Sequence, residues 1–428
     1  MTFVAPAVAV RGALALPGDK SISHRAVLVG AISDGLTEIS GFGRSLDTEA
    51  TLAAVRSLGV QVGEDGLESL RVHGVGLRGL AEPPGPIDCA NAGTLARLLP
   101  GILAGQEWRQ FELTGDESLR SRPMARIADP LAQMGAGVET ADGRLPLGLQ
   151  GRPLRGITYE LPLASAQVKS CLLLAGLYAE GSTTVIEPAP TRDHTERMLR
   201  AAGARVRVQP VKVTIWPAER LALERVDVPG DFSAAAPFLV AATLLPGSDV
   251  ILTGVGVNPT RIGFLNVLER MGSRIAVFNR RSAGGEPVAD VSVEHAELVA
   301  TEIGRDEVPS LVDELPLFAL VAAMARGETR VRGAEELREK ETDRIETVTE
   351  ALRRLGVRIR DTRDGFVIQG VPTRPRGGSM AARGDHRIAM LGAIAGLVSR
   401  EGVRIEGAEA AAVSFPAFFE LLESLTQR

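Results

Sequence analysis

Short segments that combine cations with hydroxyl or amide side chains recur where helices are expected to begin. In GDKSISHR, Lys20 precedes the expected cap Ser21, and Arg25 follows one turn later on the helix face that Ser21 shares. In CANAGTLAR, Asn91 is the expected cap, and Gly93 lets a ligand approach the backbone. Because free N–H groups at a helix N-terminus bind anions, the pattern indicates an anionic ligand. The alternative is an ordinary capped helix with solvated cations.

Three more cations lie in expected loops. Arg120 and Arg122 lie in GDESLRSRP with few acidic residues after them, and Arg192 lies in TRDH, before an amphipathic helix. Arg120 and Arg122 are as well explained as solvated cations of a loop as they are as cations that bind a ligand. Arg192 is placed to reach an anion.

The lysines are conspicuous because the sequence favours arginine so strongly. The 48 basic residues include four lysines, which leaves 44 arginines. Lys20 and Lys340 lie in the charged segments, and Lys212 in the strand-like VKVTIW is incidental. Lys169 lies with Ser165 and Gln167 at the helix start ASAQVKS. Its side chain is as well explained by an ammonium that reaches solvent along the helix as by one that binds a ligand.

A carboxylate pair and three cations mark the last third of the chain. DELP places Asp313 and Glu314 at a buried helix start, where carboxylates without partners would be costly. In EKETDRI, Lys340 and Arg344 are neighbours of like charge four residues apart, and a bound anion would turn their repulsion into attraction. Arg387 in GDHRIAM adds a cation at a further helix start.

Composition excludes several classes of protein. A net charge of −5 and 4% aromatic residues argue against a nucleic-acid binder. The two cysteines, Cys89 and Cys171, form no ligand-spaced pair, so neither a disulfide framework nor a metal site is expected. No membrane helix and no targeting segment is evident, and a cytoplasmic protein is expected.

The elements that position these residues form a repeat. Six apolar phrases, each 14 to 17 residues from a capping residue to a glycine, are followed by β-branched runs. Their expected caps are Ser21, Asn91, Ser165, Asp231, Asp313 and Asp385, and their expected C-cap glycines are Gly35, Gly105, Gly181, Gly247, Gly327 and Gly402. A second, amphipathic phrase ends at Gly59, Gly135, Gly203, Gly272 and Gly356.

Six α/β units with buried first helices predict closed domains. We expect a first three-repeat domain over residues 20–229 and a second over 230–428, joined by the N-terminal segment 1–19. The alternative is an open solenoid, although each unit is nearly twice the usual repeat length.

Seven of these segments, GDKSISHR, NAGT, SRP, SAQ, DELP, KETDR and DHR, occur in the order found in a known family. The whole chain resembles the enolpyruvyl transferases, and among them the 5-enolpyruvylshikimate-3-phosphate synthases of chorismate and aromatic amino-acid biosynthesis. Ala166 and Val413 resemble the second, divergent class of these synthases, and Glu336 stands where some members have Asn. The resemblance implies two domains of three βαβαββ units, an inside-out α/β barrel architecture that closes on substrate.

The resemblance also implies residue roles. Phosphoenolpyruvate would be held by Lys20, Gly93, Arg122, Gln167, Arg344 and Arg387. Shikimate 3-phosphate would be held by Lys20, Ser21, Arg25, Ser165, Ala166, Gln167, Arg192, Asp313 and Lys340. Arginine cannot exchange protons at neutral pH, whereas lysine and carboxylates can. The hypothesis is therefore that Asp313 takes the proton of the 5-hydroxyl, Glu341 serves at C3, and Lys20 assists at the phosphoenolpyruvate end, with no metal or cofactor in a monomer.

Two other functions stay open. The related UDP-N-acetylglucosamine enolpyruvyl transferase generally uses a loop cysteine, and GDESLRSRP contains none. A non-catalytic repeat scaffold is the second alternative, and it predicts no functional effect of substitutions at the helix starts.

Overall fold

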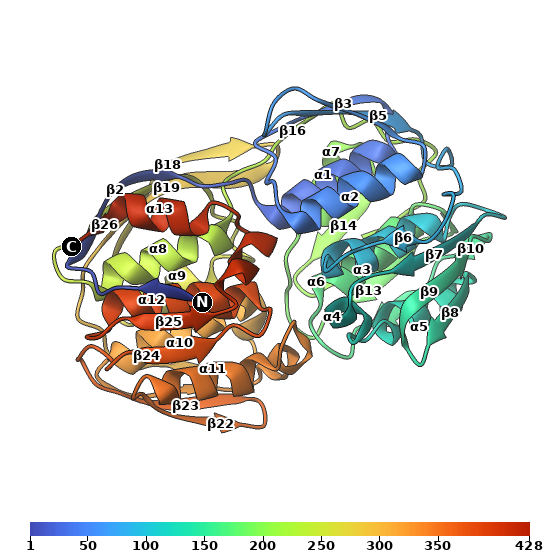
Figure 1. Ribbon diagram of the computed structural model, residues 1–428. Helices are drawn as coiled ribbons and strands as arrows, with labels where there is room; N and C mark the ends of the chain where they lie inside the picture. Colours follow the sequence, from blue (N-terminus) through green and yellow to red (C-terminus); the bar gives the residue numbers. More distant parts are fainter. The chain divides into compact units, whose positions relative to one another are not determined.

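The computed structural model describes residues 1–428, and buried helices form the centre of each of its two units (Figure 1). The 18–228 unit comprises residues 18–228 and 282–286, and the 229–428 unit comprises residues 1–17, 229–281 and 287–428. The N-terminal segment thus contributes its strands to the 229–428 unit. None of the helices is long and apolar enough to cross a membrane.

The buried helices are the first helices of the sequence repeat. In the 18–228 unit they are α1 (Lys20–Ala31), α3 (Gly93–Leu103) and α6 (Ala166–Gly176). In the 229–428 unit they are α8 (Phe232–Leu244), α10 (Leu315–Met324) and α12 (His386–Val398), which pack against one another. Every residue of α8 and α12 is buried, which confirms that apolar residues all round a helix predict a central position.

The second helices have one buried and one exposed face. They are α2 (Leu46–Ser57), α5 (Ala125–Met134), α7 (His194–Ala201), α9 (Gly263–Arg270), α11 (Arg344–Arg354) and α13 (Phe418–Leu425). The remaining helical turns are α4 (Glu117–Arg120) and the 3-10 segments η1 (Val308–Ser310), η2 (Val312–Glu314), η3 (Glu335–Glu339) and η4 (Ala408–Val413).

Four sheets of four strands share one topology. Their orders are β16 (Arg225–Asp227), β3 (Asp34–Ser40), β5 (Leu70–Val75), β4 (Gln61–Glu64); β6 (Ile87–Asp88), β7 (Gln110–Thr114), β9 (Arg144–Gln150), β8 (Gly137–Ala141); β11 (Thr158–Glu160), β13 (Thr183–Ile186), β15 (Lys212–Ile215), β14 (Val206–Gln209); and β20 (Glu302–Ile303), β21 (Gly327–Val331), β23 (Gly365–Gly370), β22 (Arg358–Thr362). In each sheet the first pair is parallel and the other two are antiparallel. The expected α/β class is confirmed.

The other sheets of the 229–428 unit include the N-terminal strands. One has the order β18 (Arg274–Ala283), β19 (Glu286–Glu294), β17 (Asp249–Gly256), β2 (Ala9–Ala15), β26 (Thr426–Gln427), and another has the order β1 (Thr2–Val4), β25 (Val403–Glu406), β24 (Gly378–Ala381). A two-stranded pair, β10 (Leu154–Arg155) and β12 (Ala179–Glu180), lies in the 18–228 unit.

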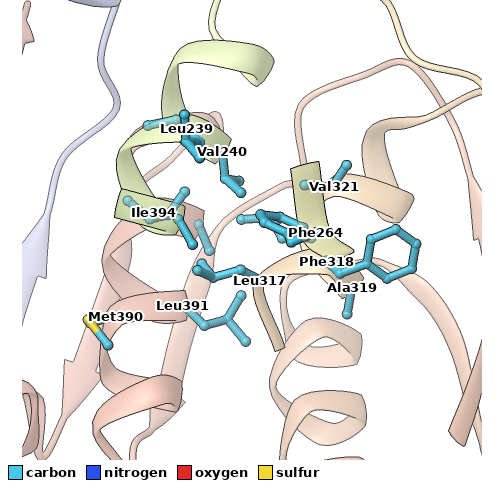
Figure 2. Close-up of a cluster of buried hydrophobic side chains, with 14 of the residues drawn as sticks. Leu239, Val240, Phe264, Leu317, Phe318, Ala319, Val321, Met390, Leu391 and Ile394 are labelled. Atoms are coloured by element: carbon cyan, nitrogen blue, oxygen red, sulfur yellow. The ribbon is translucent and has the colours of Figure 1, made fainter. Parts of the chain in front are cut away.

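Each unit has its own hydrophobic core. Figure 2 shows part of the core of the 229–428 unit, where Leu239 of α8, Phe264 of α9, Leu317 of α10 and Leu391 of α12 meet. Burying a large apolar side chain contributes roughly 1.5–3 kcal/mol, so this packing fixes where the polar helix starts lie.

Two expectations about glycine have different outcomes. The second-phrase glycines do follow helix ends in the left-handed conformation, for example Gly59 (φ 88°) after α2 and Gly356 (φ 88°) after α11. Of the first-phrase glycines, Gly105 directly follows the cap of α3 but without a positive φ, and the other five lie at least three residues beyond their helices, which corrects the prediction. Helix α1 ends at Ala31, ahead of Gly35, which lies in the following strand.

Candidate functional site

The start of α1 places Lys20, Ser21 and Arg25 together in the 18–228 unit. The cap is Asp19, whose Oδ1 accepts the Ile22 N–H at 2.9 Å, so the expected cap Ser21 is wrong. Ser21 instead lies in the first turn, half-buried. Its hydroxyl is 3.5 Å from Arg192 Nη1, in the loop before α7.

Arg25 is buried among neutral partners. Its Nε donates to Thr195 Oγ1 at 2.7 Å, Nη2 to Ser170 Oγ at 3.0 Å and Nη1 to the Ser21 carbonyl at 2.9 Å. No carboxylate lies within ion-pair distance, and burial lowers the Arg25 pKa to about 10, an effect opposed chiefly by Glu196. A buried cation with incomplete compensation favours a bound anion.

Lys20 and His24 lie on either side of the same turn. Lys20 Nζ is 2.6 Å from Asp47 Oδ2, and the lysine is half-buried. His24 Nδ1 lies 2.6 Å from Thr51 Oγ1. Burial, and then the charges of Lys20 and Arg25, lower the His24 pKa well below its ordinary value, so this ring is neutral.

Helix α3 presents a second cation group. Its cap is Ala92, and the expected cap Asn91 instead accepts from Arg122 Nη2 at 2.7 Å and donates to Asp116 at 2.7 Å. The Asn91 side chain is thus used to hold a loop arginine and an acid, and α3 has no side-chain cap. Arg122 is 5% exposed, so the solvated-loop alternative is wrong for this residue.

Gly93 opens α3 where there is little room for a side chain. A Cβ atom there would lie 2.9 Å from Arg97 Nη1 and 3.1 Å from Arg122 Nη1. Glycine therefore leaves these two guanidinium groups close to the helix start, where they favour an anion.

The start of α6 is tied to α3 through Gln167. Ser165 is the cap, as expected, and accepts the Val168 N–H at 3.4 Å. Gln167 accepts from Arg97 Nη1 at 2.9 Å and donates to Thr94 Oγ1 at 3.3 Å. Ala166 and Gln167 are half-buried beside this cap.

Lys169 does not reach solvent. It is 1% exposed, and its Nζ lies 3.0 Å from Glu187 and 2.8 Å from Glu196. Both interpretations drawn from the sequence, an ammonium in solvent and a ligand in the site, are replaced by a buried ion pair. The physical reason is that Glu187 directly follows β13 and Glu196 lies in α7, and both of these elements pack against α6.

In the 229–428 unit, Arg344 gathers three carboxylates at the start of α11. Asp385 accepts from Nε at 2.9 Å and from Nη2 at 3.1 Å, Glu341 accepts from Nη2 at 2.6 Å, and Asp313 lies 3.6 Å from Nη1. Arg344 is 1% exposed, whereas Asp313 and Glu341 are half-buried. Burial opposes the charge of Arg344, but the three carboxylates, Asp385 foremost, raise its pKa.

A second buried network holds Arg387. Helix α10 begins at Leu315 after a 3-10 turn, so the expected cap Asp313 is wrong, and Glu314 lies inside the unit. Glu314 pairs with Arg261 at 2.8 Å and accepts from Ser233 at 2.6 Å, and it lies 3.9 Å from Arg387. The Arg387 Nε is buried without a hydrogen-bond partner, which leaves a donor for an anion.

Lys340 is close to an acid of its own segment. It follows η3, and its Nζ is 2.6 Å from Glu336 Oε1, with both side chains half-exposed. Asp231 and Asp385 cap α8 and α12 as expected.

Sequence reasoning missed several supporting residues. Arg261, in NPTRIG, carried no signal of its own, although a buried Glu314 required some partner. Asp385 was identified as a cap but not as the bidentate partner of Arg344, and nothing marked Asp47 or Thr195. No group of three or more His, Cys, Asp or Glu side chains in residues 1–428 could hold a metal ion.

Comparisons with known proteins agree over the full length. A family model described as EPSP synthase (3-phosphoshikimate 1-carboxyvinyltransferase) matches residues 4–422. A 3-phosphoshikimate 1-carboxyvinyltransferase from Citrifermentans bemidjiense is 49% identical over 427 residues, covering 99% of both chains. One from Geobacter sulfurreducens is 48% identical over 425 residues, covering 99% of this chain and 98% of the other.

Solved structures show the same fold. An EPSP synthase from Acinetobacter baumannii is similar with a TM-score of 0.87 and 43% identity, covering 99% of this chain and 97% of the other. The enolpyruvyl transferase NikO from Streptomyces tendae has a TM-score of 0.79 at 20% identity, covering 99% of this chain and 96% of the other, and shares the fold.

Proposed function

Because this chain belongs to the EPSP synthase family, we propose that it transfers the enolpyruvyl group of phosphoenolpyruvate to the 5-hydroxyl of shikimate 3-phosphate, releasing phosphate. The observation that carries the proposal is the cluster at Arg344. It joins a fixed cation for an anionic substrate to two half-buried carboxylates, Asp313 and Glu341, that are able to exchange protons.

The proposed chemistry has an addition step and an elimination step. In the addition, the oxygen of the 5-hydroxyl bonds to C2 of the enol while Asp313 accepts the proton of that hydroxyl. Glu341 delivers a proton to C3. In the elimination, Glu341 takes a proton from C3, and the electrons of that C–H bond form the C2–C3 double bond. The bond from C2 to the phosphate oxygen breaks, and the leaving phosphate takes up the proton that Asp313 had accepted, with Lys20 assisting its movement. Arg344 and Arg387 hold the phosphoenolpyruvate, because guanidinium groups form charge-assisted hydrogen bonds with carboxylate and phosphate.

Asp385 supports this role of Arg344. Its two oxygens bind Nε and Nη2, which fixes the plane of the guanidinium group. The Nη1 side remains directed toward Asp313, where a substrate anion could be held beside the base.

In the 18–228 unit, the proposed ligands of shikimate 3-phosphate are Ser21, Arg25, Ser165, Ala166, Gln167 and Arg192. Arg25 supplies uncompensated charge, and the Ser21 hydroxyl lies beside Arg192. We assign Lys20 to both substrates and to proton movement. Phosphoenolpyruvate is assigned to Gly93, Arg122 and Gln167. In the 229–428 unit, shikimate 3-phosphate is assigned to Asp313 and Lys340.

The cysteines weigh against the UDP-sugar alternative. Cys89 and Cys171 are both 0% exposed, and burial raises the pKa of each thiol. A buried thiol with a raised pKa is a poor nucleophile at neutral pH.

The finer architecture is also a proposal. We infer an inside-out α/β barrel type in which each unit contains three βαβαββ repeats, with 20–229 and 230–428 as the two domains. We further propose a cytoplasmic monomer that needs no cofactor and closes on shikimate 3-phosphate, as the family resemblance implies. Small-angle scattering that shows no compaction with this ligand would count against closure.

One assay tests the function. Phosphate release from phosphoenolpyruvate is measured on adding shikimate 3-phosphate, with UDP-N-acetylglucosamine as the competing acceptor. Release only with the UDP-sugar would overturn the assignment. Lys20→Met should lower kcat by about 10²-fold, while Lys212→Met, an exposed lysine of the same unit, should leave it unchanged.

A further inference from the structure

Lys169 lies in a buried cluster that joins three elements behind Arg25. It projects from α6, and its ammonium lies 3.0 Å from Glu187 Oε2, 2.8 Å from Glu196 Oε1 and 3.3 Å from the Thr191 carbonyl oxygen. Glu187 follows strand β13, Thr191 lies in the next loop, and Glu196 lies in the first turn of α7. Glu187 and the Thr191 carbonyl accept hydrogen bonds from the ammonium group, Glu196 forms an ion pair with it, and these three partners lie on three different segments.

The segments tied by Lys169 carry the groups that hold Arg25 and Arg192. Ser170 follows Lys169 on α6, and Thr195 precedes Glu196 on α7. Their hydroxyls lie 2.7 Å apart, and both accept from Arg25, at 3.0 and 2.7 Å respectively. The Thr191 carbonyl that Lys169 binds belongs to the residue before Arg192.

Electrostatics link the same residues. Lys169 is the only cation within ion-pair distance of Glu196, and both side chains are 1% exposed. Burial raises the Glu196 pKa, and the charge of Lys169 opposes that rise. Burial lowers the pKa of Arg25, and Glu196 is the carboxylate that counteracts this most.

We propose that Lys169 is a positioning residue that holds Arg25 and Arg192 in the geometry needed to bind an anionic group of shikimate 3-phosphate, its carboxylate or its phosphate. Without its ammonium, two buried carboxylates would lack a cation, and the loop and the start of α7 would be free to shift. The hydroxyl pair that fixes Arg25 and the backbone that places Arg192 would shift with them. This inference rests on the proposed function and adds to it a residue that touches no substrate.

The test uses calorimetric titration of the full chain with shikimate 3-phosphate and with shikimate, which lacks only the phosphate. Titration separates the fraction of active protein, given by the stoichiometry, from the Kd of each folded molecule. For Lys169→Met we expect the Kd of shikimate 3-phosphate to rise about tenfold or more. A matching rise for shikimate would assign the two arginines to the carboxylate, and an unchanged Kd for shikimate would assign them to the phosphate. Lys212→Met, on the exposed side of β15, is the matched control and should bind as the wild type does.

A purely structural role would lower the stoichiometry or the melting temperature and leave both Kd values unchanged, and this result would overturn the inference. If Lys169→Met does not fold, Glu196→Gln decides, because it keeps Lys169 paired with Glu187 while removing the ionic tie to α7. A severalfold weaker binding of shikimate 3-phosphate is then expected, and an unchanged Kd would contradict the proposal. Wild-type protein that binds no shikimate 3-phosphate would overturn the function itself, which keeps the two failures distinct.

Discussion

The 18–228 unit and the 229–428 unit surround their buried arginines with different chemistry. Arg25 donates to two hydroxyls and a carbonyl, and its pKa is lowered to about 10. Arg344 donates to Asp385 and Glu341 and lies near Asp313, and its pKa is raised. Arg25 has no carboxylate within ion-pair distance, whereas Arg344 has three.

The difference suggests a division of labour. Neutral hydroxyls orient Arg25 without cancelling its charge, which suits the binding of a substrate anion that brings its own charge. The carboxylates around Arg344 hold it in place and include two half-buried groups that are able to move protons. The cluster around Arg25 is therefore built for binding alone, whereas the cluster around Arg344 combines binding of an anion with proton transfer. The predictions below test that contrast, from the largest expected effect to the smallest.

The largest effect is expected from the proton-transfer carboxylate. Asp313→Asn keeps the shape of the side chain but cannot accept the 5-hydroxyl proton, so kcat should fall by about 10²–10⁴-fold with a smaller change in KM. Steady-state kinetics measure this change. Asp290→Asn, which also alters an arginine-paired carboxylate of this unit, is the control, and an Asp313→Asn enzyme of normal kcat would refute the assigned role.

Removing Arg344, the arginine that is paired with three carboxylates, should lower the free energy of unfolding. Arg344→Met leaves the fully buried Asp385 and the half-buried Glu341 without their cation, and breaking such a buried pair costs about 3–5 kcal/mol in the free energy of unfolding. Urea denaturation measures the loss. Arg330→Met removes an exposed pair with Glu328 and should cost at most about 1 kcal/mol, and equal stability of the two variants would break the comparison.

Arg25→Met should show the opposite balance. Ser170 and Thr195 already bond one another, so losing Arg25 leaves no buried carboxylate unpaired and should destabilise the unliganded protein less than Arg344→Met. Binding, in contrast, should suffer, with the Kd of shikimate 3-phosphate rising about 10²-fold. Calorimetry and denaturation on the same samples decide, and a variant that binds normally but unfolds easily would reverse the assignment.

Sequence reasoning predicted what depends on local pattern. The buried helices followed from apolar residues all round α8 and α12, and the turns at Gly59 and Gly356 followed from the need for a positive φ after a helix. The cap of α1 was assigned to Ser21, whereas the neighbouring Asp19 reaches the Ile22 N–H. Two good capping residues that are two positions apart are not separable by pattern.

Partners distant in the sequence were beyond prediction. Arg261 and Glu314 are 53 residues apart, and Arg344 and Asp385 are 41 apart, so only folding brings them together. Lys169 was expected either to reach solvent or to bind the ligand, and the buried ion pair was missed because its acidic partners, Glu187 and Glu196, lie outside its own helix. The cations of the site were visible in the sequence because they lie in short segments, but their pairing with particular carboxylates, such as Arg344 with Asp385, was not.

The smallest predicted effect is the pH dependence of stability that comes from His24, which lies close to the positive charges of Lys20 and Arg25. His24 is held neutral, with its pKa lowered well below the ordinary value by burial and then by Lys20 and Arg25. Above pH 6.5 neither the folded nor the unfolded chain is protonated there. Below pH 6.5 the unfolded chain takes up a proton that the folded chain does not, so stability is lost as the pH falls.

Wild-type protein should therefore lose about 1 kcal/mol of unfolding free energy per pH unit below 6.5 from this residue alone, and His24→Gln should lack that contribution. Denaturation of both proteins between about pH 6.5 and 5 measures the difference, with His73→Gln, on strand β5, as the control. Because Lys20 and Arg25 contribute to lowering the pKa, bound shikimate 3-phosphate should reduce the pH dependence by neutralising them. An identical slope for His24→Gln and wild type would mean that the turn near Arg25 does not hold His24 in its neutral form.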